Sequence, residues 1–196
     1  MSFTLIPPQT CCAFFPLWSE PVGIKRGFYT TFLDSEDGGE QRSAIASKVT
    51  KAHGFTVQTR NQTETSYLRR RITMYVNKVW AVPIWPYEME LASEAASGQA
   101  VLNVNTTVNR ELTAGSGEMV ILRTNYNNVE SGEVSAFDGN SITLDSNLSN
   151  TWPAGTKLYP VLRSTLGTAV DLEAPTPEHS KVQFEFVESF RSQYTE

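Results

Sequence analysis

The sequence predicts a mainly β fold with a single helix, an α+β arrangement in which a small β-barrel or sandwich is inserted into a larger domain. Three observations carry this prediction. Short β-like runs recur through the middle of the chain, only one segment has a helical period, and the chain closes on a strand with no local neighbour. With 196 residues, 40% of them hydrophobic, the chain is long enough to bury a sizeable core.

The composition also bears on partners and location. The formal net charge of −5 gives no basic surplus, so specific nucleic-acid binding is not expected. The first eighteen residues, MSFTLIPPQTCCAFFPLW, contain no basic residue, and prolines interrupt the apolar stretch. We therefore expect neither a secretion signal nor a membrane span. The adjacent Cys11 and Cys12 are unsuited to a mutual disulfide, and we expect two packed thiols.

The first third of the chain reads as extended segments separated by turns. Residues 3–25 contain four prolines and predict irregular chain, followed by a strand over 25–33, KRGFYTTFL. The acidic, Gly-Gly-containing segment 34–42, DSEDGGEQR, predicts a turn that continues as a polar loop to about residue 53. Extended structure resumes over 53–62, HGFTVQTRNQ.

One segment, TETSYLRRRITMYVNK at 63–78, has the period of a helix. Its apolar residues form one stripe, made of Leu68, Ile72, Tyr75 and Val76. Thr63 is the expected N-terminal cap. The three consecutive arginines at 69–71 lie off or beside the stripe, which indicates a solvated or partner-facing charged surface.

The middle of the chain predicts a small β unit. After an alternating segment within 92–112, the runs EMVILRT, VESGEVSAF and SITLDS are separated by Gly, Asn and Asp turns. Turns at intervals of roughly eight to twelve residues are typical of a small barrel or sandwich. The segment TWPAGTKLYPVL closes the unit, and we place its limits at residues 91–165.

The final strand ties the two ends of the chain together. In KVQFEFVESF, Val182, Phe184 and Phe186 alternate with Gln183 and Glu185, the pattern of a strand with one buried face. Such a strand needs a sheet to join. We expect it to return to the N-terminal part, so that 1–90 and 166–196 form one domain.

Candidate catalytic groups are sparse. His53 and His179 have no carboxylate or cysteine at metal-ligand spacing, and the chain has neither a nucleophile elbow nor a phosphate-binding glycine loop. Glu88 and Glu90 are alternate residues of an extended segment and suggest a glycosidase pair only weakly. The sequence therefore predicts a protein that is not an enzyme and takes no metal or other cofactor, with a hydrolase using these two carboxylates as an open alternative.

A second alternative is a binding function. Trp152 and the asparagine-rich turns TNYNN and SNLSN are compatible with a glycan or cell-surface recognition module, because tryptophan faces stack on sugar rings. Tryptophans beside prolines at the ends of elements more often fill a core or an interface. A glycan array or a cell-adsorption assay distinguishes the two.

A series of short motifs points to a family. FPLWSEPV, then DGGEQR, a helix leading to WAVPIW, a β-rich insert ending WPAGTKLYPV, and a closing VQFEFVE together resemble the distal tail proteins of long-tailed bacteriophages (siphophages) and of gene transfer agents. The resemblance covers most of the chain. It implies a tail-tube-like β-sandwich with one helix that forms a ring, a hexamer, at the distal end of the tail tube.

The resemblance further implies a location and partners. The protein would be part of the virion, in the phage tail, after assembly in the host cytoplasm. It would contact the tail tube protein on one side and the tail tip or hub protein on the other. We expect five residues of these motifs to lie at contacts between subunits: Trp18, Glu40, Arg42, Trp80 and Trp85. Glu40 and Arg42 are expected in a charge pairing, and Trp80 and Trp85 are also expected to anchor the helix to the sheet.

Overall fold

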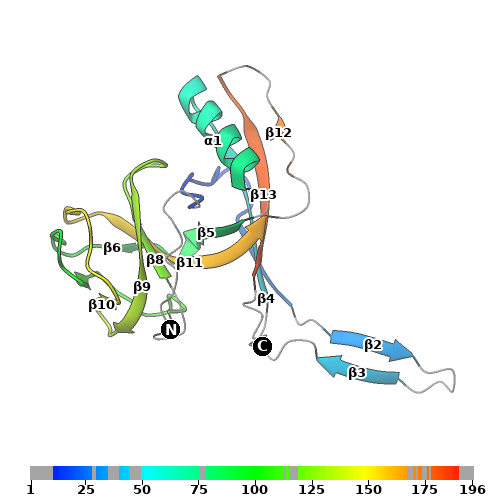
Figure 1. The fold of residues 1–196 in the computed structure, drawn as a ribbon, viewed down its shortest axis with the longest axis horizontal. Helices are drawn as coiled ribbons and strands as arrows, with labels where there is room; N and C mark the ends of the chain where they lie inside the picture. The colour runs from blue at the N-terminus through cyan, green and yellow to red at the C-terminus, as the bar shows by residue number, and fades with distance from the viewer. Residues whose placement is uncertain are drawn as a thin grey trace.

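The chain forms a strongly β structure with one α-helix, as the sequence predicts (Figure 1). The computed structural model describes residues 11–27, 30–34, 40–44, 50–75, 78–112, 114, 119–166, 170, 172–173, 176 and 178–189. For β2, β3 and β12 only the backbone is described. The elements are β1 (Gly23–Gly27), β2 (Thr30–Asp34), β3 (Glu40–Ala44), β4 (Thr50–Gln58), α1 (Gln62–Tyr75), β5 (Val79–Pro83), the 3-10 helix η2 (Trp85–Tyr87), β6 (Met89–Glu90), β7 (Val101–Asn103), β8 (Met119–Arg123), β9 (Val129–Phe137), β10 (Ser141–Leu144), β11 (Lys157–Leu166), β12 (Leu172–Glu173) and β13 (Lys181–Glu188).

One large antiparallel sheet organises the molecule. Eleven strands belong to it, and its main path runs β1-β4-β13-β11-β8-β9-β10-β7. β5 and β6 also pair with β11, and β12 pairs with β13. Figure 1 shows β11 sweeping from the lobe that holds β8, β9 and β10 to the lobe that holds α1 and β13. The insert and the body are therefore joined by continuous hydrogen-bonded sheet.

The C-terminal strand returns to the N-terminal part of the chain, as expected. β13 pairs with β4 over seven residue pairs, from Lys181 opposite Gln58 to Val187 opposite Ala52. The side chains of Val182, Phe184 and Phe186 are buried. Gln183 and Glu185 between them are exposed, which is the alternation that the sequence indicated.

Two hydrophobic cores lie on opposite faces of β8. Met119 and Ile121 belong to the core of the body, whereas Val120 and Leu122 belong to the core of the insert. All four side chains are buried, because successive residues of a strand point to opposite faces. The predicted insert at 91–165 therefore contributes side chains to both cores.

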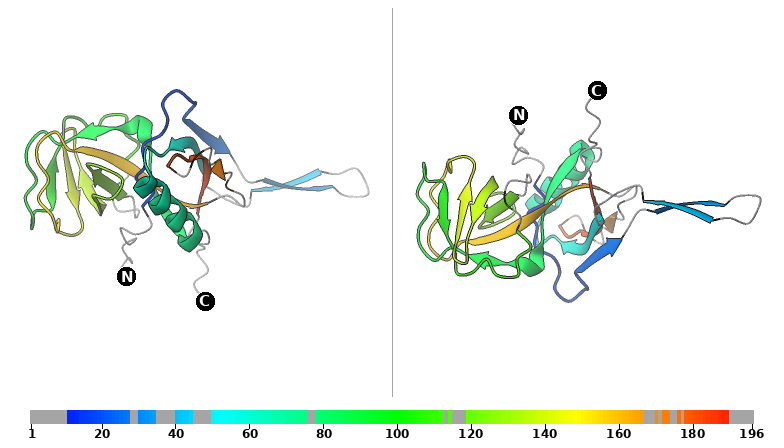
Figure 2. Two further views of the ribbon diagram at one scale, coloured as in Figure 1. Left: turned by 90° about the horizontal axis from the view of Figure 1, so that it is seen from above. Right: turned by 90° about the horizontal axis from the view of Figure 1, so that it is seen from below.

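A hairpin formed by β2 and β3 projects away from the rest of the molecule (Figures 1 and 2). The two strands make a separate two-stranded sheet, with Thr30 opposite Ala44 and Asp34 opposite Glu40. The prediction of a polar loop to about residue 53 is wrong here, because this loop contains β3 and the first residues of β4. The polar composition of β3, EQRSA, hid the strand because it lacks the apolar alternation of a half-buried one.

The N-terminal cap of helix α1 is Asn61, two residues before the predicted cap Thr63. The side-chain oxygen of Asn61, not of Thr63, accepts the N–H of Glu64 at 2.9 Å. The Glu64 carboxylate in turn accepts the N–H of Arg60, the residue before the cap, at 2.8 Å, so the two ends of this first turn bond to each other. Leu68 is buried and Ile72 and Tyr75 pack against the core, whereas Val76 lies outside the described residues.

The N-terminal segment runs across the body of the protein. The N–H of Cys12 donates to the carbonyl of Ala81 in β5 at 3.0 Å, and the N–H of Leu17 donates to Thr56 in β4 at 2.7 Å. Cys11 and Cys12 are free and buried, as predicted, and burial raises the pKa of each thiol to about 12. Within the described ranges, none of the helices has the length and apolar character needed to cross a bilayer.

Candidate assembly surface and binding pocket

Two of the five expected interface residues are in the core. Trp80 is 2% exposed and Trp85 is 1% exposed, so neither side chain can contact a second subunit. That part of the prediction is wrong, because Trp80 of β5 and Trp85 of the following η2 both lie in the protein's own interior. Their expected role as anchors holds for Trp80, whose indole N–H donates to the carbonyl of Tyr75 at the end of α1 at 2.9 Å.

Trp18, another of the five expected interface residues, faces solvent, with 61% of its surface exposed. It lies in a turn closed by the N–H of Glu20, which donates to the carbonyl of Leu17 at 2.9 Å. Glu20 also pairs with Lys181 at the start of β13. A large exposed indole on an anchored turn suits a contact with another protein, because tryptophan is enriched at interfaces.

Glu40 and Arg42 both belong to β3 in the projecting hairpin. Backbone register sets Glu40 opposite Asp34 and Arg42 opposite Phe32. Their side chains lie outside the described residues, so the expected charge pairing stays a prediction.

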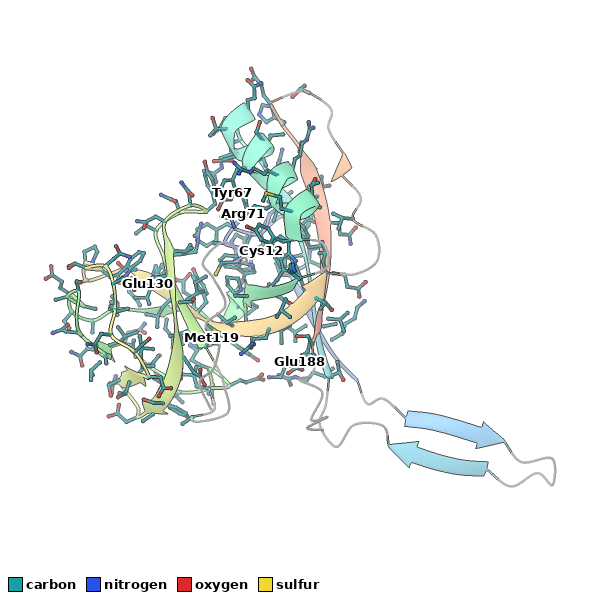
Figure 3. All side chains as sticks on the ribbon, in the orientation of Figure 1. Cys12, Tyr67, Arg71, Met119, Glu130 and Glu188 are labelled. Carbon is teal, nitrogen blue, oxygen red and sulfur yellow. The ribbon has the colours of Figure 1, made fainter. Side chains whose placement is uncertain are left out.

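An aromatic cluster joins three distant parts of the chain beside α1. Phe14 of the N-terminal segment stacks on Tyr126 of the β8–β9 turn, with ring centroids 4.9 Å apart. Tyr67 of α1 contacts both rings, and Arg71 lies over Tyr67 at 4.6 Å. Figure 3 shows Tyr67 and Arg71 on the side of the helix that faces Cys12 and the body of the protein. Arg71 therefore makes contacts within the protein and is not part of a solvated arginine surface.

A cavity of about 540 Å³ opens beside this cluster. The N-terminal segment, the start of α1 and the β8–β9 turn form its walls. Phe15 and Arg123 line it and also line a neighbouring cavity of about 320 Å³. The guanidinium carbon of Arg123 lies 3.7 Å above the centroid of the Phe15 ring. This pocket is the principal candidate for a ligand site in the part of the chain that the structure describes.

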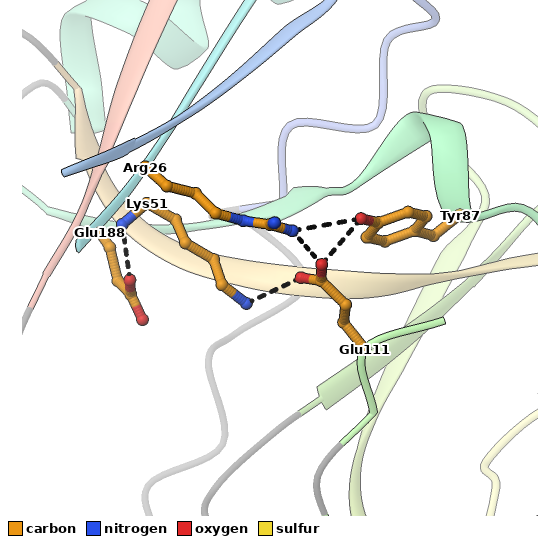
Figure 4. Close-up of polar contacts among 5 residues, drawn as sticks. All are labelled: Arg26, Lys51, Tyr87, Glu111 and Glu188. Atoms are coloured by element: carbon orange, nitrogen blue, oxygen red, sulfur yellow. Dashed lines mark hydrogen bonds and ion pairs between the residues drawn. The ribbon is translucent and has the colours of Figure 1, made fainter. Parts of the chain in front are cut away.

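A polar network links the insert to the body (Figure 4). The carboxylate of Glu111, in a loop of the insert, accepts bonds from Arg26 of β1, from Tyr87 at 2.9 Å and from Lys51 of β4 at 3.1 Å. Glu188 of β13 accepts the backbone N–H of Lys51 at 2.9 Å. Glu111 has a φ of 54°, in the left-handed region that is uncommon for residues other than glycine. Its three partners compensate for that conformation.

Glu88 and Glu90 are held by a shared cation. Lys157 of β11 lies 3.0 Å from the Glu88 carboxylate and 2.6 Å from the Glu90 carboxylate. Burial raises the pKa of Glu88, but hydrogen bonds from Tyr159 and Lys157 outweigh burial and hold the pKa below its ordinary value. A glycosidase acid needs a raised pKa, so this arrangement disfavours the hydrolase alternative.

Trp152 is buried in the core of the insert. Its indole N–H donates to Glu130 of β9 at 2.7 Å, and the same carboxylate accepts the N–H groups of Ser149 and Asn150. The face of Trp152 is therefore not available to a sugar. The glycan-binding alternative loses the tryptophan on which it rested and keeps only its asparagine-rich turns.

Each of the two histidines bonds to a neighbouring group of the fold. His53 is buried and bonds through Nδ1 to the carbonyl of Gly23 at 3.1 Å, and burial lowers its pKa. His179 contacts Thr176 near the start of β13. Over the described ranges, no group of three or more His, Cys, Asp or Glu side chains is arranged to hold a metal ion.

Sequence reasoning missed Arg123 and Glu111. Arg123 had one visible signal, since it ends the apolar strand MVILR and is the strand's single charged residue. Glu111 had none, because its partners are about 24 to 85 residues away in the chain. No protein-family model matches the sequence, and no curated protein is similar to it at a significant level.

Proposed function

We propose that this protein is a structural subunit of a long-tailed bacteriophage that forms a ring, a hexamer, at the distal end of the tail tube. In the virion it joins the tail tube protein to the tail tip or hub protein. It assembles in the host cytoplasm and has no catalytic role of its own.

The observation that carries this proposal is the projecting hairpin. β2 and β3 form their own two-stranded sheet and extend away from the body. An isolated two-stranded hairpin is marginally stable in water, and such a hairpin gains stability when a further strand or a packed surface covers it. In a ring of identical subunits, the neighbouring copy supplies that cover through a heterologous contact.

Two further observations support a ring. In the described part of the main sheet, β1 pairs only with β4, so its outer edge is open to a neighbour. Four of the five motifs behind the phage resemblance lie in the body or where the body joins the insert. They are FPLWSEPV, WAVPIW in β5 and η2, WPAGTKLYPV at the start of β11, and VQFEFVE in β13. The fifth, DGGEQR, leads into β3.

The experiment measures assembly with and without the hairpin. The mass of the full chain is determined by light scattering over a range of concentrations, and particles are viewed by negative-stain microscopy. We expect a concentration-dependent hexamer that forms rings. Replacing residues 30–44 by a short Gly-Ser linker is expected to leave a folded monomer, because these strands are not part of the main sheet.

Circular dichroism and thermal unfolding establish that the shortened chain is folded. A full-length chain that stays monomeric at every concentration, and that does not add to purified tail tubes, contradicts the proposal. Rings that form equally well without the hairpin refute the hairpin as the assembly arm while leaving the ring itself supported.

A further inference from the structure

Arg123 is a buried cation with no ion-pair partner among the described residues. Its side chain is 4% exposed, and its Nε has no hydrogen-bond partner among the described residues. None of the ion pairs between described residues includes it. Its contacts are instead with aromatic faces, Phe15 at 3.7 Å and Trp85 at 5.6 Å.

An unpaired buried guanidinium is costly, because the interior solvates a charge poorly. Burial lowers the pKa of Arg123 to about 10, which still leaves the group charged at neutral pH. Trp85 lies nearby, with its ring centroid 5.6 Å from the guanidinium carbon. Its indole Nε1 is also a buried donor that lacks a partner. Two unsatisfied donors therefore lie in one small region.

The surroundings of Arg123 are those of a binding site. The residue lines both cavities, of about 540 and 320 Å³. Contact with Phe15 uses the face of the guanidinium and not its edge, so the terminal N–H groups of that edge can bind an acceptor. Phe14, Phe15 and Leu17 add apolar walls to the larger cavity, and Arg60 adds a second cation.

We infer that this pocket binds a carboxylate that lies beside an apolar or aromatic group, with Arg123 as its main ligand. A planar carboxylate matches the guanidinium edge with two parallel hydrogen bonds. The apolar walls suit the organic part of the ligand. Glu64 also lines the larger cavity, and its negative charge disfavours a multiply charged anion such as phosphate.

The test uses benzoate as the probe, with benzamide as its neutral analogue and inorganic phosphate as a second anion. Binding to the full chain is followed by calorimetry and by the shift in melting temperature. We expect benzoate to bind and to raise the melting temperature, and benzamide and phosphate to do neither. Equal shifts from benzamide or phosphate would overturn the assignment to a carboxylate.

Arg123→Met removes the charge but keeps much of the side-chain volume. We expect benzoate affinity to fall about tenfold or more, as a charge-assisted pair is lost, and the unliganded variant to be no less stable than the parent. Arg123→Lys keeps the charge without the paired donors and is expected to bind benzoate at intermediate strength. Arg70→Met, on the exposed surface of α1, is the matched control and is expected to bind like the parent.

A guanidinium that only supports the fold gives the opposite result. In that case benzoate has no effect on the parent, and Arg123→Met lowers the melting temperature. If Arg123→Met does not fold, the Arg123→Lys variant decides: unchanged benzoate affinity there overturns the role of the paired donors.

The carboxylate has two sources, a free organic acid or an acidic side chain of a neighbouring subunit, and assembly separates them. Saturating benzoate blocks assembly if a neighbour's side chain normally occupies the pocket, and leaves assembly unchanged if the natural ligand is a free acid. Binding of benzoate to the unassembled chain is measured independently, so the pocket stands or falls separately from the proposed ring.

Discussion

Phe184 of β13 lies directly opposite Phe55 of β4, and their ring centroids are 5.8 Å apart. Phe186 stacks on Phe55 as well, at 5.9 Å. This contact joins residues almost 130 positions apart in the chain. It is the point at which the end of the sequence completes the core that its first half begins.

Replacing Phe184 by alanine is expected to lower the free energy of unfolding of the whole body by about 3 to 5 kcal/mol, through lost burial and a new cavity. Urea unfolding followed by tryptophan fluorescence measures this change, because Trp80 is in the same core. Gln183→Ala, one position away and exposed, is the control and is expected to stay within about 0.5 kcal/mol of the parent. Similar losses from both substitutions would contradict the inward orientation of Phe184.

Trp18→Ser is expected to weaken ring assembly by about tenfold or more, because a tryptophan at an interface often carries much of the binding energy. Light scattering at several concentrations gives the assembly midpoint. Val108→Ser is the matched control, since Val108 is also 61% exposed but lies in the insert. Assembly unaffected by Trp18→Ser would remove Trp18 from the subunit contact without altering the role expected of the hairpin.

Glu111 is expected to make the junction between insert and body sensitive to acid. Burial raises its pKa, but hydrogen bonds from Tyr87 and Lys51 outweigh burial, so the pKa in the folded protein lies below the ordinary 4.5. A carboxylate with a lowered pKa stabilises the fold above its unfolded-state pKa, and this stabilisation is lost as the pH falls through the folded-state value.

Glu111→Gln tests this because glutamine keeps the shape but not the charge. We expect the variant to be less stable than the parent at pH 7 and the difference to shrink at about pH 3, where the parent carboxylate is protonated. Urea unfolding at both pH values gives the comparison. Glu94→Gln, at an exposed position elsewhere in the insert, serves as the control. A difference for Glu111→Gln that is equal at both pH values would contradict the electrostatic account.

Glu130→Ala is expected to destabilise the insert by about 1 to 3 kcal/mol, because it leaves the buried indole N–H of Trp152 without an acceptor. Hydrogen exchange should then increase around residues 148–152, whose backbone also bonds to Glu130, before it increases in β4 and β13. Glu94→Ala is the control. Exchange that rises uniformly over all described strands would show that the insert does not open separately.

Much of the fold was visible in the sequence because its signals are local. The alternation of Val182, Phe184 and Phe186 identified β13, and the spacing of Leu68, Ile72 and Tyr75 identified α1. β3 was missed because its side chains are polar, and a hairpin that projects from the body has no buried face to mark it. The cap was misplaced by two residues because Asn61 and Thr63 are both good caps, and the choice depends on backbone geometry.

The candidate sites were less predictable because they depend on contacts between distant residues. Trp80 and Trp85 looked suitable for an interface, but the pairing of β5 with β11 and the contact of Trp85 with Tyr159 place them in the interior. Phe15 and Arg123 are more than one hundred positions apart, and no spacing rule connects them. Trp152 has the composition of a sugar platform, yet the bond to Glu130 fixes it in the core.

Because β8 and β11 contribute to both cores, the insert cannot be exchanged as a cassette by cutting the chain near residues 91 and 165. Such a cut would remove Met119, Ile121 and Tyr159 from the body and leave its interior incomplete. Chimeras that retain these two strands and replace only the outer ones, β7, β9 and β10, would preserve the scaffold. Sequence variation in this protein is therefore expected in the outer strands of the insert, where residues can change without disturbing β8 and β11.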